Sequence, residues 1–182
     1  MFNYDPNLTL NQSLQQMDGD PPSNIPFIVW LLENPASPIA LPGNIDLFRH
    51  DCLHLLLDRG FSLNDEAFVV GFTMGNDPAT KRWHLICFKL FAWLLYPAKY
   101  RFSSMQLKIV ELGFVYGRSI ALKNFNRLDF APYFNCTLAE LRSHFGIDSQ
   151  TLASFVQVER ILSEPSGSDP TLPNVIPQPQ AS

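Results

Sequence analysis

Four residues near the first third of the chain have types and spacing suited to binding a metal ion: His50, Asp51, His54 and Glu66. On an α-helix with about 3.6 residues per turn, His50 and His54 lie one turn apart on one face, and Asp51 lies about 100° round from His50. Zinc sites on helices use such an i, i+4 histidine pair, with carboxylate oxygen as a further ligand. The pattern predicts a divalent-ion site, with Zn²⁺ favoured and Mg²⁺ as the alternative.

Glu66 can complete this set if the chain forms a helical hairpin. Gly60 predicts the end of the histidine-bearing helix, and Glu66 follows near the start of the next helix. An antiparallel hairpin returns Glu66 to the last turns of the first helix. The alternative is an ordinary role for each residue, with surface imidazoles, an Asp51 paired to basic side chains and an acid favoured by the helix dipole.

Other chemistry-bearing patterns are absent from the sequence. It contains no H-E-x-x-H motif, glycine-rich phosphate loop or nucleophile elbow, which disfavours hydrolases. His84 and His144 are isolated, so we expect structural or surface roles for them. Cys52, Cys87 and Cys136 are odd in number and form no C-x-x-C pair, which predicts reduced thiols in a cytoplasmic protein.

The elements that must position the candidate ligands are predicted to be helices throughout. Apolar residues recur at helical spacing, and no run of strict alternation indicates a strand. We expect an all-α, single-domain protein of six or seven helices with an apolar interior. Asn44 and Asn64 are the expected N-caps of the two helices of the hairpin. The predicted helices cover 25–34, 45–59, 64–74, 79–96, 103–125, 137–145 and 148–162, inside a domain of 25–162 with flexible ends at 1–24 and 163–182.

Charge and hydropathy limit the partners. The net charge is −4 and the 13 basic residues are scattered, so no nucleic acid is expected as a partner. The most apolar window, His84 to Tyr96, is shorter than the roughly 20 residues that span a bilayer. A peripheral rather than integral association with a membrane surface is predicted, with Trp83, Trp93, Tyr96 and Tyr100 at the interface.

The metal-binding pattern also carries a family resemblance. His50-Asp51-x-x-His54, eleven residues and then Glu66 resemble the H-D-x-x-H-x11-E motif of the ubiquinone (coenzyme Q) biosynthesis protein 4 family. The segment Leu138-x-x-Leu141-Arg142-x-x-Phe145-Gly146-Ile147 is similar to the L-x-x-L-R-x-x-L-G-I segment of that family. The two likenesses together cover about 45–150.

The resemblance implies an all-helical, dimeric protein that associates peripherally with membranes. It implies His50, Asp51, His54 and Glu66 as metal ligands and as the catalytic set for oxidative decarboxylation at ring carbon 1 of a polyprenylated hydroxybenzoate. The sequence departs from the family pattern at Cys52-Leu53, where an aromatic residue is usual, and after Glu66. Metal binding carries over better than the reaction, because it depends only on the four matched residues.

These observations predict a prenylquinone biosynthesis protein that binds a divalent metal and a polyprenylated ring precursor. The alternative is a non-catalytic isoprenoid carrier or scaffold, in which the ion only anchors the head group. A third interpretation makes the four residues a structural staple of the hairpin.

A prenyl tail is expected to lie in a channel lined by the 64–75, 79–96 and 103–125 helices. The glycine pairs Gly71–Gly75 and Gly113–Gly117 each leave a gap on one helix face, although close helix packing is the alternative use of such pairs. The predicted lipid-binding residues are Phe72, Gly75, Phe88, Phe114, Gly117 and Arg118.

Overall fold

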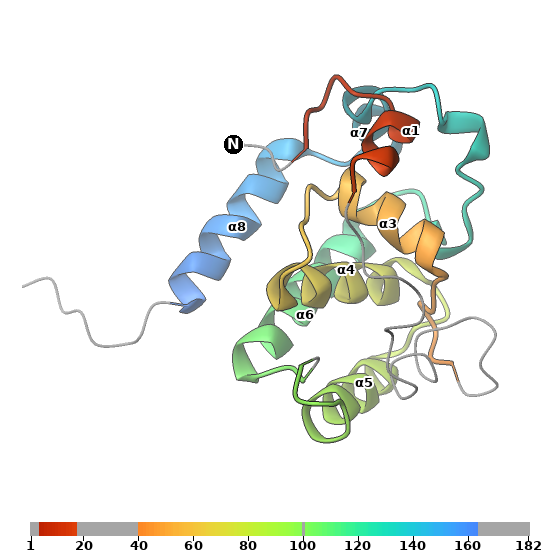
Figure 1. Ribbon diagram of the computed structural model, residues 1–182. Helices are drawn as coiled ribbons and strands as arrows, with labels where there is room; N and C mark the ends of the chain where they lie inside the picture. Colours follow the sequence, from red (N-terminus) through yellow and green to blue (C-terminus); the bar gives the residue numbers. More distant parts are fainter. Residues whose placement is uncertain (1–3, 18–39, 100, 164–182) are drawn as a thin grey trace, which may run out of the picture.

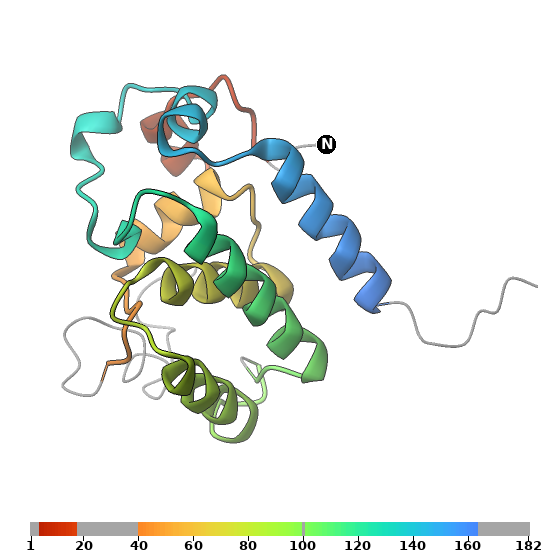
Figure 2. The same cartoon turned by 180° about the vertical axis from the view of Figure 1, so that it is seen from behind.

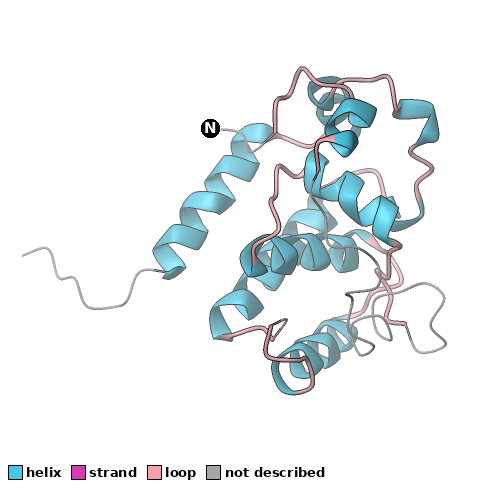
Figure 3. Cartoon of the chain, in the orientation of Figure 1, coloured by secondary structure: helices cyan, strands magenta, loops and turns pink. Residues whose placement is uncertain are grey.

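The computed structural model describes residues 4–17, 40–99 and 101–163. Within these ranges every regular element is helical, so the all-α prediction is confirmed (Figure 3). The α-helices are α1 (Leu10–Gln15), α3 (Leu47–Leu56), α4 (Leu63–Asn76), α5 (Arg82–Leu94), α6 (Ser104–Ser119), α7 (Leu138–Phe145) and α8 (Ser149–Ser163). The predicted helix over 25–34 and residues 164–182 of the predicted tail lie outside the described residues.

Both helices of the predicted hairpin begin at a different residue from the one expected. The N-cap of α3 is Asp46 rather than Asn44, and that of α4 is Ser62 rather than Asn64. Each of these side chains accepts a hydrogen bond from the backbone N–H three residues later, at Arg49 and Asp65 respectively. Several residues in each stretch could serve as an N-cap, and the path of the chain decides which one does.

Helices α4 and α6 lie side by side at the centre of the molecule (Figures 1 and 2). A Cβ atom added at Gly71, Gly75, Gly113 or Gly117 would overlap a backbone carbonyl oxygen of the opposite helix. Close packing, one of the two alternatives left by the sequence, therefore accounts for both glycine pairs. The contact leaves no space for a lipid chain at these four positions.

Residues 4–17 fold against the rest of the molecule instead of forming the flexible segment expected over 1–24. The Leu10 side chain is fully buried, and its backbone N–H donates to the Cys136 carbonyl at 2.9 Å. The Leu138 N–H donates to the Leu8 carbonyl at 3.0 Å. These backbone bonds and the buried leucine offset the entropy of ordering a short segment.

Helix α7 holds the C-terminal end of the histidine-bearing helix α3. Arg142 is 3% exposed, and its Nε and Nη2 atoms donate to the carbonyls of Leu56 at 2.9 Å and Leu55 at 2.8 Å. The last carbonyls of a helix lack partners within it and carry partial negative charge, so a guanidinium suits this position. Arg142 thus supports the helix that carries His50 and His54.

Helix α5 lies at the opposite end of the molecule from α1 and α7 (Figure 1). Its inner face is anchored by Phe88 and Ala92, which are at most 1% exposed. The Phe102 N–H donates to the Ala92 carbonyl at 3.1 Å and ties the following loop to this helix. None of the described helices is long and apolar enough to span a membrane.

Candidate metal centre

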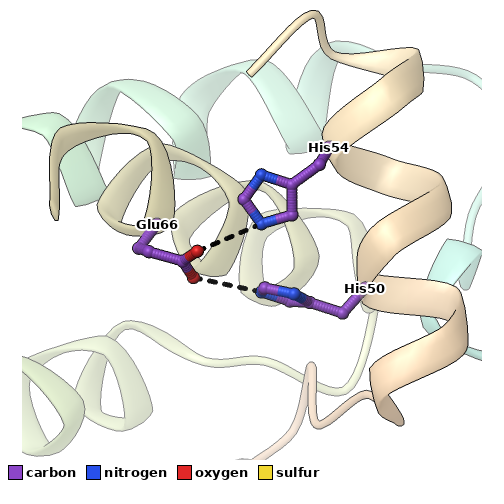
Figure 4. Close-up of side chains that lie close together, drawn as sticks. All are labelled: His50, His54 and Glu66. Carbon is purple, nitrogen blue, oxygen red and sulfur yellow. Dashed lines mark ion pairs between the residues drawn. The ribbon is translucent and has the colours of Figure 1, made fainter. Parts of the chain in front are cut away.

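The loop between α3 and α4 turns the chain so that three of the four predicted ligands meet. The left-handed residue that ends the first helix is Asp58, with φ 55°, and not Gly60 as expected. Aspartate tolerates this conformation better than most residues, because its short polar side chain can bond locally. The resulting hairpin places Glu66 of α4 opposite His50 and His54 of α3 (Figure 4).

The three side chains converge with spacings suited to one ion. Glu66 Oε2 lies 3.4 Å from His50 Nε2, and Glu66 Oε1 lies 3.4 Å from His54 Nε2. One candidate ligand atom from each residue falls within 4.8 Å of the others. Ligand atoms about 2.0–2.1 Å from a tetrahedral ion are themselves about 3.4 Å apart, whereas an N–H···O hydrogen bond is about 2.7–3.2 Å long. Each imidazole nitrogen thus lies about one tetrahedral edge from a Glu66 oxygen and too far for a good hydrogen bond, and the carboxylate faces the two imidazoles with different oxygens.

The His54 ring is held in the orientation that a ligand needs. Its Nδ1 atom lies 3.3 Å from the backbone carbonyl oxygen of Arg59, to which it can only donate, and this leaves a lone pair on Nε2. The side chain is fully buried, and Nε2 has no hydrogen-bond partner. A buried, unpaired acceptor directed at a carboxylate is unfavourable unless a cation or proton lies between them.

Asp51, the fourth predicted ligand, is not part of the converging group of described residues. It lies on α3 beside His50, and the helical rotation of about 100° between neighbours directs the two side chains differently. Burial raises the pKa of the Asp51 carboxyl to about 6, with further contributions from His54, which lowers it, and from Glu66, which raises it. Asp51 is thus electrostatically coupled to the group without joining it.

The three converging residues carry unequal proton affinities. Burial lowers the pKa of His50 to about 4, despite the opposing charge of Glu66. Burial also disfavours the charged form of His54, but the Glu66 carboxylate, 3.4 Å from His54 Nε2, outweighs this effect and raises the pKa of His54. Burial would raise the pKa of Glu66, but the two imidazoles lower it. A divalent ion would replace the proton that this group otherwise holds on His54.

Two features of the site were not predicted from the sequence. The exposed ring of Phe61 lies 5.1 Å from the His54 ring, centroid to centroid. The Arg59 carbonyl that orients His54 is a backbone group, and no side-chain pattern marks it. The only signal in the sequence is that Arg59 and Phe61 lie in the short loop between the two ligand-bearing helices.

The predicted lipid-binding residues lie elsewhere, around α4, α5 and α6. Phe72, Phe88 and Phe114 are at most 7% exposed and pack in the core. Phe88 also lines a hollow of about 10 Å³, which is room for about one water molecule. The Arg118 Nη2 donates to the Thr80 carbonyl at 2.8 Å, so this guanidinium joins α6 to the loop before α5.

Comparisons of the chain with protein-family models, with curated proteins and with solved structures give no match.

Proposed function

We propose that this protein binds a divalent metal ion, Zn²⁺ by preference, through His50, His54 and Glu66. The observation that carries this proposal is the Nε2 atom of His54, which is fully buried, lacks a hydrogen-bond partner and lies 3.4 Å from the Glu66 carboxylate. Without a proton or an ion on it, this nitrogen is an unpaired buried acceptor, which costs about 1–3 kcal/mol. A bound ion would satisfy it and would also neutralise the carboxylate.

The donor set favours zinc and leaves room for a substrate. Two imidazoles and one carboxylate are common zinc ligands, whereas Mg²⁺ prefers oxygen ligands and retains water. Three protein ligands on a tetrahedral ion leave a fourth position open, which is typical of catalytic rather than structural sites. The ion would act there as a Lewis acid toward a carboxylate or phenolic oxygen.

We infer a polyprenylated hydroxybenzoate as the substrate class, and prenylquinone synthesis as the role, from the resemblance of the motif at His50, Asp51, His54 and Glu66. The oxidative decarboxylation at ring carbon 1 and the homodimer rest on that resemblance alone. The alternative remains a non-catalytic isoprenoid carrier, in which the ion anchors an anionic head group.

Elemental analysis and calorimetric titration with Zn²⁺ test the metal site. We expect one ion per chain, and a loss of affinity of at least tenfold in His54→Ala and Glu66→Gln, since each removes one of three ligands. His144→Ala is the matched control, because His144 is exposed and lies outside the group. Failure of the wild-type protein to retain Zn²⁺, or retention by His54→Ala equal to that of the wild type, would exclude the site.

A second function, peripheral binding to an anionic membrane, is favoured by helix α5. Its outward face is apolar, with exposed fractions of 49–66% at Trp83, Ile86, Leu90, Trp93 and Leu94. These residues follow helical spacing and form one stripe, as interfacial helices do. Tyr96, in contrast, is 2% exposed and packs against Phe88 and Phe102, so it cannot serve as an interface residue; Tyr100 lies outside the described residues.

The charge around α5 fits the same partner. Between Asp77 and Glu111 the sequence has no acidic residue, and six basic ones: Lys81, Arg82, Lys89, Lys99, Arg101 and Lys108. This local excess contrasts with the net charge of −4 of the whole chain. Basic side chains beside an apolar stripe bind anionic head groups, with about 1 kcal/mol for each cation near the surface.

Flotation with vesicles tests the membrane surface. We expect binding to vesicles that contain phosphatidylserine, weaker binding to pure phosphatidylcholine, and loss of binding in Ile86→Gln and Trp93→Gln. Val115→Gln is the control, because Val115 is equally exposed, at 63%, but lies on α6. If Val115→Gln loses as much binding as Trp93→Gln, the attachment is not specific to α5.

A further inference from the structure

Arg59 occupies a central place between the two helices that carry the candidate ligands. Its side chain is 2% exposed, and its guanidinium lies 3.8 Å from the centroid of the Phe68 ring. Nη1 donates to Glu159 Oε2 at 2.9 Å, and Nη2 lies 2.8 Å from Glu159 Oε1. One charge-assisted hydrogen bond and a second close ion contact hold the guanidinium against this carboxylate.

The backbone of the same residue holds His54. The Arg59 N–H donates to the His54 carbonyl at 2.8 Å, and the Arg59 carbonyl lies 3.3 Å from His54 Nδ1. The position of the Arg59 peptide therefore sets the direction of the His54 ring. A ligating histidine depends on such a partner for its tautomer and orientation.

Arg59 also contacts the residue next to Glu66. Its Nη1 lies 3.8 Å from Asp65 Oδ1, and Asp65 in turn bonds the backbone N–H and hydroxyl of Ser62 at the start of α4. One residue thus connects α3, through its backbone, with α4 and α8, through its side chain, although Glu159 is 100 residues away in the sequence.

The geometry points to Arg59 as a positioning residue of the metal centre, and to the Glu159 carboxylate on α8 as the anchor that holds it in place. The inference rests on the proposed metal binding. Helix α8 then has a purpose beyond covering the core, because its docking keeps the Arg59 carbonyl against His54. A purely structural ion pair would stabilise the fold without changing the affinity of the folded protein for metal.

Metal affinity in the folded state separates these two roles. In Glu159→Gln the anionic anchor is lost, and we expect Zn²⁺ to bind about tenfold more weakly, at the lower end of the effects of residues that orient ligands. Arg59→Lys keeps a positive charge but cannot reproduce both contacts with Glu159, and should lie between Glu159→Gln and the wild type. Glu111→Gln is the control, since it breaks the exposed Lys89–Glu111 pair far from any ligand in sequence.

The full-length proteins are titrated with Zn²⁺ at a temperature where circular dichroism shows each to be folded. The absorption bands of bound Co²⁺ are recorded as a second readout of ligand geometry. A weaker Zn²⁺ affinity with altered Co²⁺ bands in Glu159→Gln, and neither change in Glu111→Gln, supports the inference. If Glu159→Gln lowers the unfolding temperature but binds Zn²⁺ and Co²⁺ as the wild type does, the pair is structural and the inference is wrong. A wild-type protein that binds neither ion refutes the proposed function itself.

Discussion

The two ends of helix α4 differ in how well their neighbouring atoms fit together. One end is closely packed, and the other holds buried polar atoms that pair poorly. Toward the C-terminal end, Gly71 and Gly75 allow the backbone of α6 to approach until no further atom fits. Near the N-terminal end, Glu66 faces two imidazoles at distances too long for a strong hydrogen bond, and His54 Nε2 has no hydrogen-bond partner. Glu66 and Gly75 are separated by only about 14 Å along the helix axis.

This difference marks the histidine–glutamate end as the one that could hold a metal ion. The glycine contact gains its dispersion energy from atoms of the chain, so it is complete without any other molecule. The histidine–glutamate group instead combines buried polar atoms that pair poorly with one another. A protein keeps such an arrangement at a cost in stability, which is reasonable where a bound ion recovers that cost.

The largest effect is expected at the glycine contact between α4 and α6. Gly75→Ala places a Cβ atom against the Phe114 carbonyl, and we expect it to lower the free energy of unfolding by about 3 kcal/mol, because two backbones must separate. Urea denaturation measures this value. Val115→Ala, at an exposed position on α6, should stay within about 0.5 kcal/mol of the wild type. An unchanged midpoint for Gly75→Ala would mean that the helices can part at no cost.

A somewhat smaller change in stability is expected when zinc binds at the histidine–glutamate group. With free Zn²⁺ at about 100 times its dissociation constant, the wild type should gain about 2.7 kcal/mol of stability, and a chelator should remove this gain. Glu66→Gln keeps the size of the side chain but removes its charge, so most of the gain should vanish. Thermal unfolding with and without Zn²⁺ measures it. An equal gain in both proteins would place the ion elsewhere.

The pH dependence of stability should distinguish the metal-free protein from the zinc-bound one. The pKa of His54 is raised above its usual value of 6.5, so its contribution to the stability of the metal-free protein is fully present below pH 6.5 and is lost as pH rises through the raised value. Zinc affinity should change in the opposite direction, because fewer protons compete for His54. Urea titrations at increasing pH, with zinc or chelator, measure both slopes. Slopes of the same sign would contradict the shared use of His54.

The smallest expected effect concerns the exposed face of α5, which belongs to neither end of α4. Trp93 is 53% exposed, so Trp93→Ser should change the free energy of unfolding by no more than about 0.5 kcal/mol. Chemical denaturation measures this change. A loss above 2 kcal/mol, roughly the burial energy of a large apolar side chain, would show that this face is covered within the protein itself.

Much of the helical architecture was predictable because it follows from local rules. Helical periodicity gave the class, and the predicted helices over 64–74 and 137–145 differ from α4 and α7 by at most two residues at each end. The predicted helix over 103–125 was wrong beyond Ser119, where α6 ends and a 3₁₀ turn follows at Phe125–Arg127. Asn76 explains the difference, because its side chain bonds the Leu122 carbonyl and the Phe125 N–H and draws this segment away from a helical path.

The sequence by itself determined that His50 and His54 share a helix face, because the helix repeat is set by backbone hydrogen bonds. It also determined that Glu66 follows after the loop that ends this helix. Only the tertiary structure decided that Asp51 stays outside the group, that the glycines meet backbone rather than lipid, and that Glu159 reaches Arg59. These outcomes depend on how helices far apart in sequence pack together. Such packing minimises the free energy of the whole chain, and no local pattern of residues encodes it.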